Sequence, residues 1–325
     1  MNTMDAEKEW LRRMKKQCDT KENSYKEETM ENPICNDILE VNGKGLEEVA
    51  GMNSLKQLIT EGFINILKHQ ECASAYGIKP PALLFYGPAG CGKTFFAEKM
   101  AEEIGINFMK IVPDDIACTW IHGTQQKIGE LFRKAEKNGP TLIFFDEFEA
   151  MVPHRSSNEA NQHQNGEVNE FLCMLNNAAD RGIYVVAATN FPERIDKAIL
   201  RTGRIDEIIY IDMPDAESRE ALFKLELKKL PVEEDIDFMQ LATLTDGYNC
   251  SDINYIIKTA SRKMFNETIK DEKQSYKKIT QKVLEETISQ RPPSITERML
   301  REYERIRNEF SPNNMKRKET RIGFH

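Results

Sequence analysis

The stretch Gly87-Pro88-Ala89-Gly90-Cys91-Gly92-Lys93-Thr94 decides which fold this sequence predicts. It follows the apolar run at residues 82–86, which indicates a buried strand, and it precedes a helical pattern that begins near Phe95. Glycines in such a loop let several backbone N–H groups and a helix N-terminus point at one anion. Lys93 adds a positive charge and Thr94 a hydroxyl that can bind Mg²⁺, so the stretch predicts a loop that binds nucleotide phosphates.

Apolar runs and amphipathic patterns alternate on both sides of this loop. The apolar runs predict strands at residues 82–86, 107–112, 141–147, 182–190 and 208–211. Helices are expected at residues 55–67, 95–104, 128–135 and 171–175, and an exposed loop at residues 154–167. Strands that alternate with helices predict an α/β fold, a three-layer sandwich around a parallel sheet.

Beyond Pro214 the strand patterns cease and only helical patterns remain. The expected organisation is therefore a mobile charged leader, an α/β nucleotide-binding domain, a small helical lid domain, a C-terminal helix and a disordered basic tail, at residues 1–44, 45–213, 214–293, 294–310 and 311–325. A short partner-binding helix around Trp10 is the alternative for the leader. The C-terminal helix has one stripe of large side chains, at Met299, Tyr303, Ile306 and Phe310.

Composition limits the kinds of function that fit the chain. The net charge of −8 disfavours a nucleic-acid groove as the main surface. The 7 cysteines are scattered and form no C-x-x-C pair, which is typical of reduced thiols in a cytoplasmic protein. No long apolar run or signal peptide is present, so we expect no membrane span.

Two acidic residues, Asp146 and Glu147, end the apolar run at residues 141–147. Catalytic groups of open parallel sheets gather at the carboxyl ends of the strands. An acid at this position can hold Mg²⁺, and the next acid can polarise the water that attacks the γ-phosphate. The alternative is an ordinary polar strand end, but it leaves without a role two carboxylates whose placement at a buried strand costs free energy.

Three later segments join the loop in a fixed order: Ile143-Phe144-Phe145-Asp146-Glu147-Phe148-Glu149-Ala150, Ala187-Ala188-Thr189-Asn190 and Leu200-Arg201-Thr202-Gly203-Arg204-Ile205-Asp206. Together with the loop they resemble an AAA-type ATPase of the AAA+ superfamily, over residues 46–310. The resemblance implies the AAA+ fold, ATP and Mg²⁺ as cofactors, and a homo-oligomeric ring, usually a hexamer.

The resemblance also implies roles for individual residues. By this resemblance Lys93 and Thr94 bind phosphates and Mg²⁺, Asp146 is the acidic residue that holds Mg²⁺, and Glu147 activates the attacking water. Asn190 occupies a sensor position, where its amide orients that water.

Arg201 and Arg204 match the arginines that similar proteins present to the γ-phosphate of a neighbouring subunit. Thr202 replaces the proline often found between them. The alternative for the arginines is a local salt bridge to Asp196 or Asp206.

Other segments match the parts of the family that enclose the nucleotide. Residues 247–253 resemble the lid segment that closes over adenine, with Ser251 where a small residue usually sits, and Val49 and Gly51 match the motif on the other side of the base. The phosphate loop and Phe95 complete the expected nucleotide-binding set. Cys91 is either a small filler within the loop or a thiol whose oxidation stops binding.

Trp120 and Ile121 correspond to the loop that similar protein translocases point into a central pore, where a large aromatic face can grip an extended chain. The family's lysine is Thr119 here, and a core tryptophan is the alternative. Residues 154–167 would then form a second pore loop.

The C-terminal helix is similar to that of the spastin, katanin and endosomal-sorting ATPase group, where it packs back on the ATPase domain. A surface helix is the alternative. The terminal Ile322-Gly323-Phe324 resembles a loop by which some unfoldases dock on a ring protease, against the alternative of a disordered end.

Two functions follow from the resemblance. The first is an ATP-driven ring that remodels, unfolds or disassembles protein substrates by threading them through its pore, with an adaptor that selects them. The second is an ATP-dependent oligomeric switch or scaffold that activates a partner effector, such as a protease or defence effector, without threading.

Overall fold

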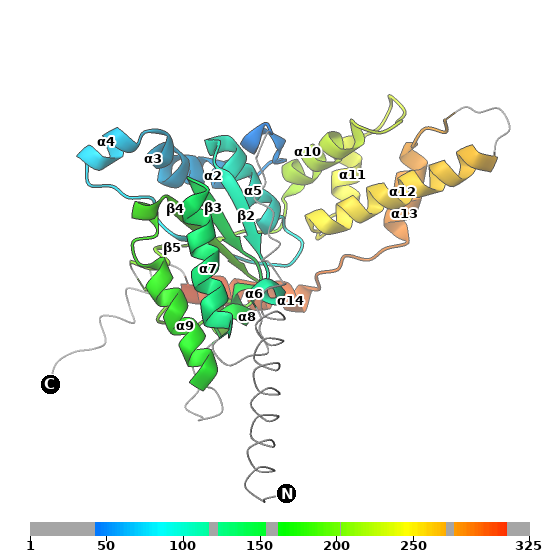
Figure 1. Cartoon of the computed structure of the whole chain (residues 1–325). Helices are drawn as coiled ribbons and strands as arrows, with labels where there is room; N and C mark the ends of the chain where they lie inside the picture. The colour runs from blue at the N-terminus through cyan, green and yellow to red at the C-terminus, as the bar shows by residue number, and fades with distance from the viewer. Residues whose placement is uncertain (1–42, 117–122, 154–161, 202, 271–275, 311–325) are drawn as a thin grey trace, which may run out of the picture. The chain divides into compact units, whose positions relative to one another are not determined.

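The computed structural model describes residues 43–116, 123–153, 162–201, 203–270 and 276–310 (Figure 1). Several expected features lie outside these residues: Trp120 and Ile121, most of the leader, the loop at residues 154–161, Thr202 and the tail after residue 310. They stay predictions.

A parallel sheet of five strands forms the centre of the nucleotide-binding part, in the order β2-β3-β4-β1-β5. The strands are β1 (Leu83–Tyr86), β2 (Asn107–Ile111), β3 (Thr141–Phe145), β4 (Ile183–Thr189) and β5 (Glu207–Tyr210). All five predicted strands are present, and the α/β prediction is confirmed.

Side chains of each central strand alternate between two hydrophobic cores, one on each face of the sheet. On β1, Leu84 packs into one core and Phe85 into the other. The expected three-layer arrangement is visible in Figure 1. The helices and short turns of this part are η1 (Gly45–Glu48), α2 (Asn53–Ile59), η2 (Thr60–Ile64), α3 (Asn65–Lys68), α4 (Gln70–Ala75), α5 (Lys93–Ile104), α6 (Pro113–Ile116), α7 (Gly123–Lys137), α8 (Phe148–Met151), α9 (Gln162–Leu175), η4 (Ala179–Arg181) and η5 (Pro192–Arg194).

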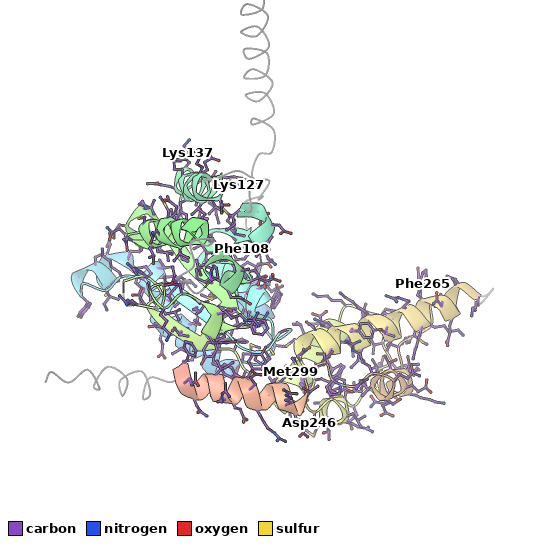
Figure 2. The ribbon with its side chains drawn as sticks, turned by 90° about the horizontal axis from the view of Figure 1, so that it is seen from below. Phe108, Lys127, Lys137, Asp246, Phe265 and Met299 are labelled. Atoms are coloured by element: carbon purple, nitrogen blue, oxygen red, sulfur yellow. The ribbon has the colours of Figure 1, made fainter. Side chains whose placement is uncertain are left out.

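Each covering helix buries one apolar stripe against its core. Helix α7 buries Leu131 and Phe132 in the core that contains Leu84, while Lys137 lies on its outer side (Figure 2). Helix α5 buries Phe96 in the opposite core, which contains Phe85. Because β1 is packed against a hydrophobic core on each face, the loop that follows it begins at a well-fixed point.

A helical region follows the sheet and comprises α10 (Ala216–Leu227), α11 (Phe238–Leu244), α12 (Cys250–Lys270) and α13 (Gln281–Ser289). These helices share a separate core that includes Phe223, Leu241, Ile256 and Leu284. The last helix, α14 (Glu297–Phe310), buries Tyr303 and Ile306 and leaves Met299 partly exposed (Figure 2).

Helix α14 packs on the ends of β1 and β5. The Phe310 ring lies 5.8 Å from that of Tyr86, and Arg307 lies over the Tyr210 ring at 4.8 Å. Arg307 also forms a 3.1 Å ion pair with Asp212. These contacts favour the expectation that the helix packs back on the ATPase domain over the alternative of a free surface helix.

Two local expectations were wrong. Residues 162–167 belong to helix α9, although we expected a loop through residue 167. The segment lacks large apolar side chains, but α9 is anchored further on by Val168 and Phe171, so its first turns need none. The helix expected at residues 55–67 was to bury an apolar stripe that includes Leu58, but Leu58 is 50% exposed, because the helix contains the widened turns of η2 and the buried face changes phase there.

Candidate nucleotide site

The loop after β1 needs its glycines for two separate reasons. Gly92 has a φ of +87°, in the left-handed region that favours glycine, and it places Lys93 at the first position of α5. A Cβ on Gly87 would lie 2.1 Å from the Ile211 carbonyl oxygen, so β5 and the loop approach too closely for alanine there. The local sequence therefore builds a glycine-rich loop and a helix N-terminus of the kind that binds phosphate.

Lys93 is buried beneath this loop, and its ammonium is fully hydrogen-bonded. Its Nζ donates to the carbonyl oxygens of Gly87 at 2.9 Å and Pro88 at 2.8 Å, and to Oδ1 of Asn190 at 2.8 Å. Burial lowers the pKa of Lys93 to about 8, although the negative charge of Asp146 acts in the opposite direction. A phosphate in this position would replace the carbonyl partners and favour the charged form.

Thr94 and Asp146 come together although 52 positions separate them in the chain. The Thr94 hydroxyl donates to Oδ2 of Asp146 at 3.0 Å. Mg²⁺ in nucleotide sites takes one or two protein oxygens and completes its shell with phosphates and water. A hydroxyl and a carboxylate oxygen at this distance fit Mg²⁺, and these two residues would hold it.

Lys110 of β2 is a partner of Asp146 that we did not predict from the sequence. Its Nζ lies 2.9 Å from the same Oδ2 that accepts the Thr94 hydroxyl. The other carboxylate oxygen of Asp146 accepts the backbone N–H of Glu147 at 3.1 Å. Both carboxylate oxygens of Asp146, the predicted Mg²⁺ ligand, thus already have polar partners within the chain.

Glu147 has a backbone conformation that non-glycine residues seldom adopt, with a φ of 51°. Its side chain is exposed and lines the same cavity as Lys93, Thr94 and Asn190. Strained backbone of this kind persists where its surroundings fix it, often at functional sites. The turn directs a carboxylate into the cavity at the end of β3, as a residue that positions water requires.

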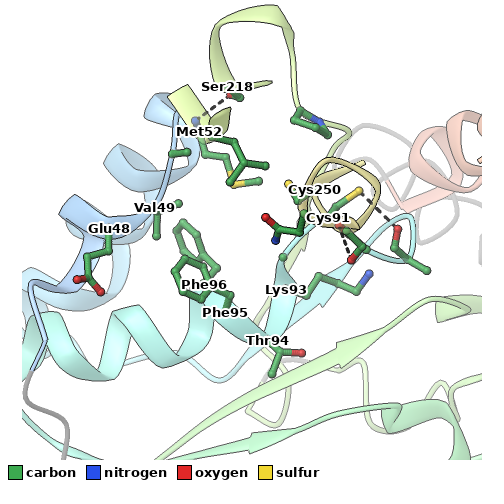
Figure 3. Close-up of a pocket in the computed structure, with 18 of the residues that line it drawn as sticks. Glu48, Val49, Met52, Cys91, Lys93, Thr94, Phe95, Phe96, Ser218 and Cys250 are labelled. Atoms are coloured by element: carbon green, nitrogen blue, oxygen red, sulfur yellow. Dashed lines mark hydrogen bonds between the residues drawn. The ribbon is translucent and has the colours of Figure 1, made fainter. Parts of the chain in front are cut away.

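The cavity has a volume of about 440 Å³ and contains most of the predicted nucleotide-binding residues (Figure 3). Val49, Phe95 and Ser251 line it together with the loop from Ala89 to Thr94. Gly51 does not line this cavity. It faces α10 instead, where a Cβ would lie 2.1 Å from the Ser218 hydroxyl.

Several lining residues were not predicted because they belong to no motif. Leu222, Leu225 and Asn254 come from α10 and α12 of the helical region, and Met52 directly precedes α2. The hydroxyl of Ser218 accepts the Met52 N–H at 3.3 Å, which ties α10 to the segment before α2 (Figure 3). Only the packing of α10 and α12 against the loop identifies them.

Asn249, directly before α12, fastens the helical region to the phosphate loop. Its Nδ2 donates to the Ala89 carbonyl oxygen at 3.1 Å and to the Ser294 hydroxyl at 2.9 Å, and its Oδ1 accepts the Asp252 N–H at 2.8 Å. The Ser251 N–H donates to the Gly90 carbonyl oxygen at 3.1 Å. The helical region is therefore hydrogen-bonded directly to the phosphate loop.

Arg201 and Arg204 lie away from this cavity. They precede β5, whose first residue, Glu207, pairs with Leu83 at the amino-terminal edge of the parallel sheet. The phosphate loop follows the opposite ends of the strands. Arg204 donates to the Ala198 carbonyl oxygen at 2.6 Å.

The proposed local partner Asp206 is engaged elsewhere. Its carboxylate accepts the backbone N–H groups of Gly203 at 2.8 Å and Ala82 at 3.1 Å. This geometry gives no support to a salt bridge between Asp206 and the arginines.

Cys91 is fully buried in the loop, close to Cys250 (Figure 3). Burial raises the pKa of its thiol to about 12. Reactive thiols are exposed and have a lowered pKa. The filler interpretation of Cys91 is therefore favoured over the oxidation switch.

These features define a class of protein: a phosphate-loop ATPase whose parallel sheet is followed by a helical region. Residues 83–213 match the family described as ATPase family associated with various cellular activities (AAA). The chain contains an ATPase domain of the AAA family.

Curated relatives carry the same domain. The chain is 33% identical over 283 residues to a cell division cycle protein 48 homolog of Archaeoglobus fulgidus, covering 84% of this chain and 39% of that protein. It is 33% identical over 224 residues to a putative cell division cycle ATPase of Plasmodium falciparum, covering 68% of this chain and 18% of that protein. It is also 33% identical over 260 residues to the human ATPase family gene 2 protein homolog A, covering 79% and 29%. The chain thus spans well under half the length of each relative.

No helix in the described ranges is long and apolar enough to cross a membrane.

Proposed function

We propose that this chain binds and hydrolyses ATP with Mg²⁺ as one subunit of a homo-oligomeric ring, most simply a hexamer. The observation that carries the proposal is that the predicted catalytic residues lie in two groups, at opposite edges of the sheet. Lys93, Thr94 and Glu147 gather at one edge of the sheet, whereas Arg201 and Arg204 lie at the other. A second copy that presents its arginine edge to this cavity would complete the site.

Each residue has a chemical task in this scheme. Lys93 and the loop N–H groups bind and orient the β- and γ-phosphates, and Thr94 and Asp146 hold Mg²⁺, which neutralises phosphate charge when bound. Glu147 orients the attacking water and accepts its proton, and Asn190 fixes the position of that water. An arginine from the neighbour stabilises the charge that develops on the γ-phosphate.

We further propose that the ring remodels, unfolds or disassembles protein substrates, which move past Trp120 and Ile121 in a central pore and are delivered by an adaptor. The family relationship and the aromatic-aliphatic pair support this proposal. The competing switch or scaffold would need the ring but not the pore residues.

The free thiols at Cys72, Cys91, Cys173 and Cys250 support a reducing compartment such as the cytoplasm.

Glu147→Gln tests the ATPase and ring proposal, because it keeps the side-chain shape and removes the base. We expect it to bind ATP, to form stable oligomers in sedimentation and to turn over slowly. Lys93→Ala, which lacks the ammonium that binds the phosphates, is the matched control and by itself should form fewer oligomers with ATP. Rapid hydrolysis by Glu147→Gln would contradict the role of Glu147.

The ATP-bound Glu147→Gln protein also serves as a trap for substrates and adaptors, which can be identified after capture. Trp120→Ala then separates threading from switching. Loss of substrate remodelling with intact ATPase activity supports threading, and unchanged function supports the switch.

A further inference from the structure

Lys110 contacts Asp146, the predicted Mg²⁺ ligand, but the proposed ATPase chemistry gives it no task. It lies on β2, next to the last residue of the strand, and its partner across the ladder is Phe144 on β3. Two positions beyond Phe144 the chain reaches Asp146, whose N–H continues the ladder by donating to the Ile111 carbonyl oxygen at 2.9 Å. The two strands thus hold the Lys110 ammonium beside the Asp146 carboxylate.

The ammonium uses an oxygen that the metal site also needs. Oδ2 of Asp146 lies 2.9 Å from Lys110 Nζ and 3.0 Å from Thr94 Oγ1. A divalent ion shared by Thr94 and Asp146 would lie next to this same oxygen. A positive charge so close to the ion opposes its binding.

The environment of the pair allows the ammonium to leave. The Lys110 side chain is 43% exposed and that of Asp146 is 25% exposed. An exposed lysine on a flexible stem can move into water, where its charge is well solvated. The interaction is thus strong enough to orient Asp146 and weak enough to be displaced.

We propose that Lys110 is an internal counter-ion for Asp146, the predicted Mg²⁺ ligand. Between catalytic cycles its ammonium pairs with the Asp146 carboxylate and competes there with the divalent metal. Its ion pair orients the Asp146 carboxylate, and its positive charge lowers the metal affinity of the site. Lys110 is therefore a positioning residue, and its inferred role rests on the proposed Mg²⁺–ATP function. The consequence is easier release of metal and nucleotide after each turnover.

The test measures Mn²⁺ binding by electron paramagnetic resonance, in the presence of saturating ADP, for the full chain and three variants. Lys110→Met removes the competing charge and should bind Mn²⁺ about three- to tenfold more tightly, the size expected for a partly exposed charge beside a divalent ion. Lys110→Arg keeps the charge and should stay within about twofold of the native affinity. Lys79→Met is the matched control, because it breaks an exposed 2.8 Å pair with Asp180 far from the cavity and should change nothing.

Equal or weaker Mn²⁺ binding by Lys110→Met would overturn the inference. If the Met variant loses fold or ADP binding in EDTA, Lys110→Gln replaces it, and the same gain in Mn²⁺ affinity is required. A native chain that binds neither ADP nor Mn²⁺ contradicts the proposed function and this inference together. A native chain that binds both, with no gain in the neutral variants, contradicts the Lys110 inference alone.

Discussion

The Lys93 ammonium donates a 2.8 Å hydrogen bond to the side-chain oxygen of Asn190, at the end of β4. Strand β4 lies between β1, which leads into the phosphate loop, and β3, which ends at Asp146. The lysine predicted to bind phosphate and the predicted sensor are therefore in direct contact. We expect a γ-phosphate that attracts Lys93 to change this contact, so that the position of Asn190 depends on the bound nucleotide.

The lowered pKa of Lys93 predicts proton uptake on nucleotide binding. Burial holds this pKa at about 8, so the free protein loses the ammonium charge as the pH rises through that value. Bound phosphates stabilise the ammonium and raise its pKa, so ATP binding above pH 8 should take up most of one proton and weaken as the pH rises. Titration calorimetry at pH 9 in buffers of different ionisation enthalpy measures this uptake. A Lys93→Met protein, compared at the concentrations needed for binding, should show none.

Removing the Asn249 amide should weaken the link between the helical region and the loop. Asn249→Ala leaves the Ala89 carbonyl and the Asp252 N–H without their partner, at a cost of about 1–3 kcal/mol in the free energy of unfolding. ATP affinity should fall as well, because the loop is then less ordered. Urea unfolding and nucleotide titration measure the two effects. Gln57→Ala, which loses only an exposed hydrogen bond to Glu61, should leave both unchanged.

Complementation between inactive subunits tests whether the arginines act in trans. Lys93→Ala lacks phosphate binding and Arg204→Ala lacks the proposed finger, so each protein alone should have little ATPase activity. Mixed rings contain interfaces with an intact Lys93 on one side and an intact Arg204 on the other, and activity should partly return. An ATPase rate for the mixture that equals the sum of the separate rates would argue for a role within one chain.

Helix α14 should contribute measurably to stability through its buried face. Ile306→Ala removes a side chain that is only 7% exposed and should cost about 2 kcal/mol or more in the free energy of unfolding. Arg301→Ala breaks the exposed pair with Glu297 on the same helix and should cost less than about 0.5 kcal/mol. Comparable midpoints for the two variants in thermal unfolding would show that α14 does not stabilise the domain.

The five strands and the phosphate loop were predictable because each has a local signal. Strands β3 and β4 are continuous apolar runs, and the phosphate loop is a glycine pattern with a required strand and helix on either side. The start of α9 was not predictable, because a polar helical turn and a polar loop have the same composition. The tight approach of Gly87 to Ile211 was equally invisible, since it depends on how β5 pairs with β1.

The sequence by itself determined the chemistry of the site: Lys93 and Thr94 are recognised from the loop motif, and Asp146 and Glu147 from their place at the end of an apolar strand. Tertiary structure alone decided how these groups are coupled. It paired Lys110 with Asp146, fastened Asn249 to the loop and placed Arg204 at the far edge of the sheet. The physical reason is that motifs record local backbone and side-chain chemistry, whereas strand order and helix packing decide which distant residues share an oxygen atom or a cavity.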